Sequence, residues 1–93
     1  MTKEETIAKL DEIQELLEKH LSYVAITEVE DVYHEEREEV IRAFTFSRGT
    51  KETIAVLGAD AQIHFYKHMG ERICEELLYD MCAVLLLYLA RYN

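Results

Sequence analysis

Two histidines in the C-terminal third of the chain have a spacing that suits a metal ion. His64 and His68 lie one helical turn apart, and Glu71 and Glu75 continue the row in steps of three and four residues. A histidine pair at i and i+4 beside a carboxylate is a pattern that binds zinc. The zinc-protease motif H-E-x-x-H is excluded because Phe65 stands where its glutamate would be. We expect no metal and no cofactor, with a small-ligand or metal-binding module as an alternative.

Nucleophilic catalysis needs a reactive thiol or hydroxyl. Cys74 and Cys82 lie eight residues apart, which in a helix is about 12 Å along the axis and too far for a disulfide. A reactive thiolate needs an electropositive setting, and Glu75 and Glu76 provide the opposite. The two serines lie in no nucleophile-elbow pattern. We predict that the protein is not an enzyme and that its cysteines are reduced thiols in a reducing compartment.

The densest charge of the chain is the stretch EVEDVYHEEREE, residues 28–39, with seven acidic side chains against one arginine. It lacks the glycine that an EF-hand calcium loop needs for its turn. Residues 1–39 hold 13 acidic and 4 basic residues, a net charge of −9, whereas residues 40–93 hold six of each. Such a field repels nucleic acid and anionic membranes, and it attracts basic protein surfaces.

The carboxylates of residues 28–39 are the candidate partner-binding groups. If this stretch is helical, side chains one turn apart recur at about 5–6 Å, close enough to replace phosphates in a nucleic-acid groove. The simpler interpretation is that these side chains only keep a surface solvated. The candidate residues are Glu28, Glu30, Asp31, Glu35, Glu36, Glu38 and Glu39.

The elements that position these groups follow from the local patterns of the sequence. Thr2 and Glu5 form the capping-box pattern, and apolar residues then recur in helical steps, which predicts a helix from Lys3 to Leu21. Residues 22–27 are β-branched and aromatic and predict a short strand. For residues 28–39 we predict a short exposed helix or an ordered loop, because glutamate favours helices over strands.

Residues 40–58 predict a β-hairpin. Arg48 and Gly49 would form its two-residue turn, since glycine supplies the positive φ that such turns need. In this register Ala43 faces Ile54 across the hairpin. Both faces of the hairpin are partly apolar, so each needs a cover.

The last element is predicted to be a long helix over residues 61–92, with Asp60 as its N-cap. Unbroken, it would be about 48 Å long, which is long for a domain of this size. We therefore expect a bend or break near Gly70, or packing against a second copy. The longest uncharged apolar run, Met81 to Ala90, has ten residues and is too short to cross a bilayer.

Together these patterns predict one α+β domain over residues 1–93, in which an N-terminal helix, a short antiparallel sheet with a hairpin and a long C-terminal helix pack together. A chain this short has a thin core. The apolar end of the last helix and the two apolar faces of the hairpin expose more apolar surface than one other helix can bury. We therefore expect a homodimer with Leu85, Leu86 and Leu89 in its interface.

The order of helix, short strand, hairpin and closing helix, with TIAVLG leading directly into ADAQIHFYKHMGERI, resembles small proteins encoded by phages and prophages. The resemblance concerns the layout and composition of residues 40–93. Many such proteins counteract host defence, and some anti-CRISPR proteins are acidic inhibitors that occupy nucleic-acid sites. The resemblance implies an inhibitory binding protein and assigns no role to any single residue.

The sequence thus favours a non-enzymatic acidic protein that blocks a basic, nucleic-acid-binding protein surface, such as a phage-encoded inhibitor of a host defence nuclease. The alternatives are a structural or regulatory homodimer with a solvating acidic face, or the small-ligand module at His64 and His68. Direct nucleic-acid binding is not expected. The first ten residues contain no apolar segment of the kind found in signal peptides, which predicts a cytoplasmic location.

Overall fold

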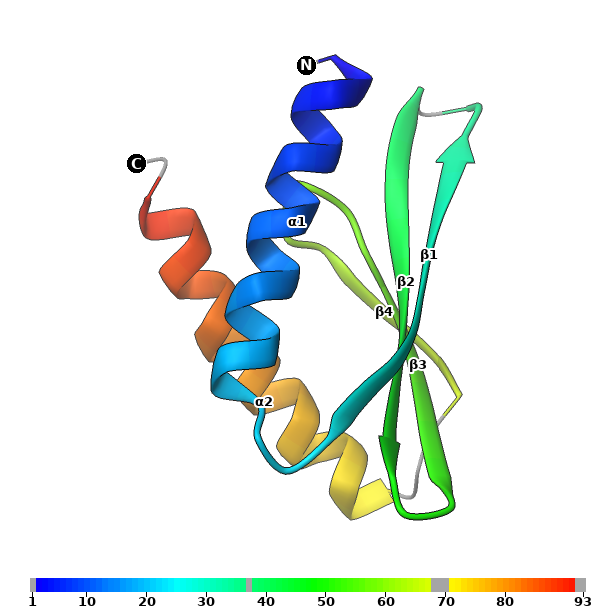
Figure 1. The fold of residues 1–93 in the computed structure, drawn as a ribbon, viewed down its shortest axis with the longest axis vertical. Coiled ribbons are helices and arrows are strands. Elements are labelled where there is room, and N and C mark those ends of the chain that lie inside the picture. The colour runs from blue at the N-terminus through cyan, green and yellow to red at the C-terminus, as the bar shows by residue number, and fades with distance from the viewer. Residues whose placement is uncertain (1, 37, 68–70, 92–93) are drawn as a thin grey trace.

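The computed structural model describes residues 2–36, 38–67 and 71–91, and for residues 64–67 and 71–74 it describes the backbone alone. Its four strands form one antiparallel sheet in the order β1-β2-β3-β4. Both helices lie on one face of this sheet (Figure 1), which confirms the predicted α+β class and layout. The elements are α1 (Lys3–His20), β1 (Ala25–His34), β2 (Glu39–Arg48), β3 (Lys51–Leu57), β4 (Ile63–Lys67) and α2 (Glu71–Ala90).

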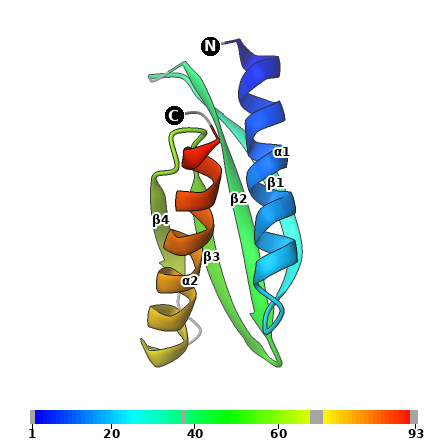
Figure 2. The same cartoon turned by 90° about the vertical axis from the view of Figure 1, so that its left-hand side faces the viewer.

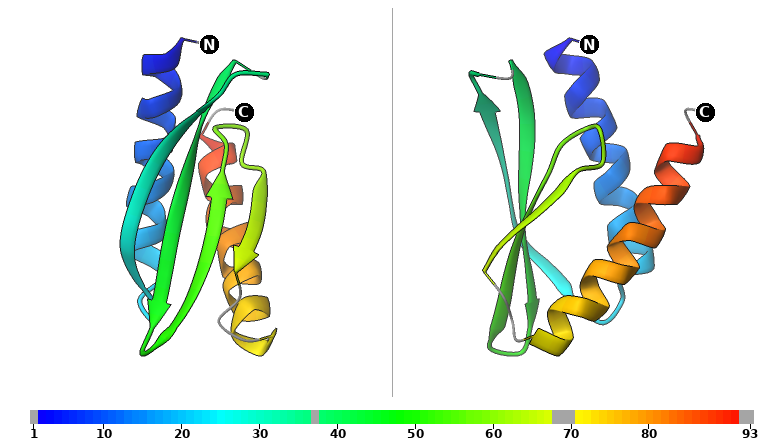
Figure 3. Two further views of the ribbon diagram at one scale, coloured as in Figure 1. Left: turned by 90° about the vertical axis from the view of Figure 1, so that its right-hand side faces the viewer. Right: turned by 180° about the vertical axis from the view of Figure 1, so that it is seen from behind.

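The two helices divide the sheet between them. Helix α1 lies in front of β1 and β2, and α2 lies in front of β3 and β4 (Figure 2). We call the sheet face that they cover the inner face. No described helix covers the opposite, outer face, which Figure 3 shows on the left with both helices behind it.

Helix α1 matches its prediction to within one residue at its end. The hydroxyl of Thr2 accepts a hydrogen bond from the Glu5 backbone N–H at 3.1 Å, so one of the free donors of the first turn is satisfied. The helix ends at His20, and Leu21 caps it by donating its backbone N–H to the Leu17 carbonyl at 2.9 Å. Local signals determine this element, and the sequence alone was sufficient to place it.

The core fills the space between the helices and the inner face of the sheet. Phe44 and Phe46 of β2 stack with ring centroids 6.0 Å apart. The hydroxyl of Tyr88 in α2 donates to the Ala59 carbonyl at 3.1 Å, which ties the end of α2 to the turn after β3. Side chains from both helices and from β2 and β3 have no exposed surface in this core: Leu10, Ile13, Leu17, Phe44, Phe46, Ala55, Leu57, Leu77 and Met81.

The predicted hairpin is confirmed, but its turn lies one residue later. Arg48 pairs with Lys51, so the turn residues are Gly49 and Thr50. Gly49 has φ +65 and occupies the first central position, where turns of type II′ take glycine. Consequently Ala43 pairs with Val56 instead of Ile54. The pairing partner thus moves by two residues along β3. A move of two residues preserves the alternation of side chains, so each side chain lies on the predicted face of the sheet.

The prediction of a helix or loop for residues 28–39 is wrong for most of this stretch. Strand β1 continues to His34, a turn follows, and β2 begins at Glu39. Positions 29, 31 and 33 face inward, opposite inward residues of β2. The alternation was hidden because Asp31, a charged residue, occupies the middle inward position. The strand predicted for residues 22–27 is confirmed only from Ala25 onward.

The prediction of one helix over residues 61–92 is also wrong in its first part. Residues Ile63–Lys67 form β4, which pairs with β3, and α2 begins at Glu71. Asp60 is therefore not the cap of this helix; its carboxylate accepts from the Gln62 backbone N–H at 3.2 Å, within the turn between β3 and β4. The predicted break at Gly70 lies outside the described residues. Pairing along the free edge of β3 outweighs the helical spacing of the apolar residues.

Candidate protein-binding surface

Strand β1 is an edge of the sheet, since it pairs only with β2. It has ten residues, and an edge of this length exposes a row of backbone groups that can pair with another chain. Two features restrain such pairing. Thr27 is an extra residue between the ladder positions of Ile26 and Glu28, and such a bulge twists the edge. The second feature is the charge of the strand.

The outer face of β1 carries two carboxylates. Glu28 lies opposite Thr45, and Glu30 lies opposite Ala43. Both glutamates are exposed, and alternate positions of a strand are about 6.6 Å apart. Val32 takes the next outer position, so the row of carboxylates ends there. The helical spacing predicted for these groups is replaced by a short row on a strand.

The turn between β1 and β2 carries the next three acidic groups. Glu35, Glu36 and Glu38 are all exposed. Glu38 has φ +50, and its backbone N–H donates to the Glu35 carbonyl at 3.3 Å. We call Glu28, Glu30, Glu35, Glu36 and Glu38 together the acidic edge. The last predicted carboxylate, Glu39, is half-buried opposite His34.

Asp31 differs from its neighbours because it faces inward and binds Arg42. The guanidinium of Arg42 donates from Nε to Oδ1 at 2.6 Å and from Nη2 to Oδ2 at 3.0 Å, a bidentate pair. Its Nη1 donates to Asp11 Oδ1 at 2.7 Å and to Gln14 Oε1 at 3.1 Å, both on α1. Arg42 is only 5% exposed, so these bonds replace the water that its charge has lost.

This network fastens the edge strand to the helix layer. The hydrogen bond with Asp31 raises the pKa of Arg42 above its ordinary value, against the opposing effect of burial. The sequence analysis missed this role for Arg42. The available signal was its inward position in β2, between Val40 and Phe44, where a lone arginine needs an acidic partner. Asp31 therefore has a structural function in addition to any contact with a partner.

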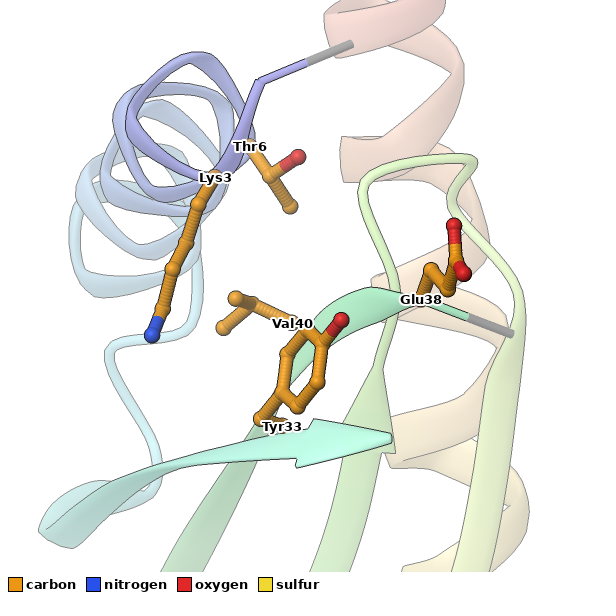
Figure 4. A pocket seen from close by; sticks show the side chains of 5 residues that line it. All are labelled: Lys3, Thr6, Tyr33, Glu38 and Val40. Carbon is orange, nitrogen blue, oxygen red and sulfur yellow. The ribbon is translucent and has the colours of Figure 1, made fainter. Parts of the chain in front are cut away.

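A shallow hollow lies between the start of α1 and the end of the β1–β2 hairpin (Figure 4). Its volume is about 360 Å³, and Lys3, Thr6, Tyr33, Glu38 and Val40 line it. The ammonium of Lys3 lies 5.4 Å from the centroid of the Tyr33 ring, within the range of a cation–π contact. This contact places a cation close to the acidic turn.

The alternative metal site at His64 and His68 assumed that both residues lie on one helix, and this is wrong for His64. His64 lies in β4, where its backbone pairs with Val56, and His68 lies outside the described residues. Cys82 is an exposed free thiol on α2, while only the backbone of Cys74 is described. Among the described side chains, which are those of residues 2–36, 38–63 and 75–91, no three of histidine, cysteine, aspartate or glutamate gather as metal ligands.

The residues predicted for a dimer interface have different environments in α2. Leu85 is buried in the core of its own chain, Leu86 is exposed, and Leu89 is half-buried against the core. A single chain does not test the predicted interface. It does show that Leu86 offers the most surface of the three.

Comparison with known proteins gives no match at a significant level, whether with family models, with curated proteins or with solved structures. In the described part of the chain, no helix combines the length and the apolar character needed to cross a bilayer.

Proposed function

We propose that this chain is a non-enzymatic, cytoplasmic binding protein whose acidic edge binds and blocks a basic protein surface. The observation that carries the proposal is the exposure of five carboxylates along one strand and its turn, against the single arginine of that stretch. A nucleic-acid-binding groove is a basic surface of this kind, and complementary charge speeds and orients such an encounter.

The Arg42 network supports this proposal because it fixes the strand that carries Glu28 and Glu30. The bidentate pair with Asp31 and the bond to Asp11 fix β1 against α1. A surface that is already ordered loses less conformational entropy when it binds. The layout resembles phage-encoded anti-defence proteins, so a nuclease of host defence is the class of partner that we propose.

The alternative is a structural or regulatory homodimer in which the acidic edge is only protective. Charged side chains and bulges on edge strands prevent pairing with other chains, and β1 has both. The two functions can be distinguished by experiment, because only the first requires a partner protein whose binding needs these carboxylates.

The test compares two variants that lose equal charge. One replaces Glu28, Glu30, Glu35 and Glu36 with glutamine; the control replaces four exposed glutamates of α1, namely Glu4, Glu5, Glu15 and Glu18. Each is used to capture proteins from a host lysate at about 50 mM and about 500 mM salt, with duplex DNA as the competing eluent.

We expect a protein that the wild type and the α1 variant retain at low salt, that DNA or high salt releases, and that the acidic-edge variant does not retain. A partner retained equally by all three proteins would contradict the proposal. If both variants lose the partner equally, total charge and not the acidic edge is responsible, and the proposal is again contradicted.

A further inference from the structure

The outward side of α2 exposes large apolar side chains. Tyr79 is 74% exposed, Leu86 is 66% exposed and Leu87 is 51% exposed, with Leu78 beside them. From Met81 to Ala90 the sequence contains no charged residue. We call Leu78, Tyr79, Leu86 and Leu87 the apolar face of α2. A helix on the surface of a domain normally places charged residues on this side.

The area of this face is large for a surface exposed to water. With about 150–250 Å² for a large side chain, the four exposed fractions amount to roughly 350–575 Å². That is about half of the roughly 800 Å² that each partner contributes to a specific interface. The smaller residues between the large ones supply part of the remainder. The face is therefore large enough to form the centre of an interface.

The pattern along the helix is complementary to itself. Tyr79, Cys82, Leu86 and Ala90 follow one row at steps of three and four residues, and large and small side chains alternate along it. If a second α2 lies antiparallel, with the two-fold axis near residue 84, then Leu86 of one copy meets Cys82 of the other. By the same symmetry, Tyr79 lies level with Leu89, next to Ala90. Large against small is how two helices interlock.

The charge distribution decides between this face and the outer face of the sheet. The outer face is also partly apolar, with Val32 exposed and Ile41 and Ile54 half-buried. However, Glu28 and Glu30 border it, and a symmetric pair would bring the carboxylates of two copies together. Pairing through α2 keeps the carboxylates of β1 apart, because β1 lies under α1 at the other side of the sheet (Figure 2). The exposed carboxylates of α2 itself, Glu75, Glu76 and Asp80, all precede the uncharged run that begins at Met81.

We propose that two copies of the chain pair through antiparallel α2 helices, with Leu86 and Cys82 at the centre of the interface and Tyr79 toward each of its ends. The contact is isologous, so Leu86 of each copy meets Cys82 of the other. Leu85 stays in the core of its own chain. The dimer carries two acidic edges on its outside, and the proposal holds whether or not these edges bind a partner.

Light scattering and sedimentation of the full chain, from about 1 µM to about 500 µM, test the proposal. We expect a dimer with a micromolar dissociation constant. Leu86→Lys should raise that constant at least about 100-fold, because it places an unpaired charge in the contact. The matched control is Val32→Lys, the same kind of change at an exposed valine of the outer sheet face, and it should leave the dimer intact. Thermal melting should show both variants folded.

A second variant reports the direction of the helices. In Leu86→Cys, mild oxidation should link position 86 of one copy to Cys82 of the other, as mapped by mass spectrometry of the cross-linked peptide. Links between the two copies of position 86 indicate parallel helices and overturn the proposal. It is also overturned if the wild type stays monomeric at the highest concentration, or if Val32→Lys dissociates the dimer and Leu86→Lys does not.

Discussion

The acidic edge and the apolar face of α2 are both exposed, but they are built for opposite kinds of contact. The first carries five carboxylates on a strand and turn, and the second belongs to a helix that has no charged residue from Met81 to Ala90. Attraction to a charged partner is screened by salt, whereas apolar contact is not. A chain of 93 residues thus keeps a charged and an apolar exposed surface apart, one along β1 and its turn and the other on α2.

The two surfaces also differ in the interactions that fix them to the rest of the protein. The apolar face belongs to a helix whose other side packs into the core through Leu77, Met81 and Tyr88. The acidic edge belongs to an edge strand that is fixed to α1 through a charged network around Arg42. One surface depends on apolar packing and the other on an ion pair. Substitutions should therefore affect them separately.

The largest expected effect is that of Arg42→Ala. Removing the buried cation leaves Asp31 without its bidentate partner and removes the packing of the arginine stem. Loss of one partner of a fully buried pair costs about 3–5 kcal/mol. Because the Asp31 side chain is 36% exposed and that of Asp11 is 64% exposed, we expect a smaller loss, about 2–4 kcal/mol. Urea unfolding measures it.

Neighbouring carboxylates on β1 provide the control. Asp31→Asn should lose part of the same stability, since it removes the charge that faces Arg42. Glu30→Gln, one residue away on the outer face, should change the unfolding free energy by less than about 0.5 kcal/mol. Equal losses in these two variants would show that the network does not hold the edge.

The sequence predicts some elements of the fold better than others, because some depend on local signals and others on contacts with distant residues. Helix α1 and the hairpin depend on local signals, namely a cap, a helical period and a glycine turn. Strand β1 was hidden because Asp31 takes an inward position, and the residue that compensates its charge, Arg42, lies eleven residues away along the chain. Strand β4 was hidden because its residues also fit a helical period. Its strand form depends on pairing with β3.

For the candidate sites, composition predicts which residues are charged but not which way they face. The carboxylates of residues 28–39 were predicted as one group, and the structure divides them into exposed, half-buried and ion-paired members. In the same way, Leu85, Leu86 and Leu89 are equivalent in an apolar run. The orientation of α2 makes Leu86 the exposed one.

An intermediate effect is expected at Tyr23, which connects the segment before β1 to α2. Its hydroxyl donates to Asp80 Oδ2 at 2.7 Å. Tyr23→Phe removes this bond and should cost about 1 kcal/mol at neutral pH, as measured by urea unfolding. Burial raises the pKa of Tyr23 above its ordinary value of 10.0, and the bond to Asp80 raises it further.

The pH dependence of this contact has a definite sign. Above about pH 10 the unfolded chain loses the Tyr23 proton while the folded chain keeps it, so stability falls as pH rises. Below about pH 10 the hydrogen bond of Tyr23 makes its full contribution to the stability of the folded chain. We therefore expect the difference between the wild type and Tyr23→Phe to shrink as pH rises above 10. A difference that stays constant through that range would show that the proton on Tyr23 does not contribute.

The smallest expected effect, the response of the dimer to salt, separates the two surfaces most clearly. Each copy has a net charge of −9, so two copies repel one another at long range even though their contact is uncharged. Raising salt from about 50 mM to about 500 mM shortens the screening length from roughly 14 Å to roughly 4 Å. The α2 dimer should therefore tighten slightly, by a factor of about two to three, whereas a partner of the acidic edge should be released. Sedimentation in both salts measures the first effect, and capture from lysate measures the second.

A dimer that weakens as salt rises would mean that attractive charges hold the two copies together. In that case the acidic edge, paired with cations of the second copy, would be the interface.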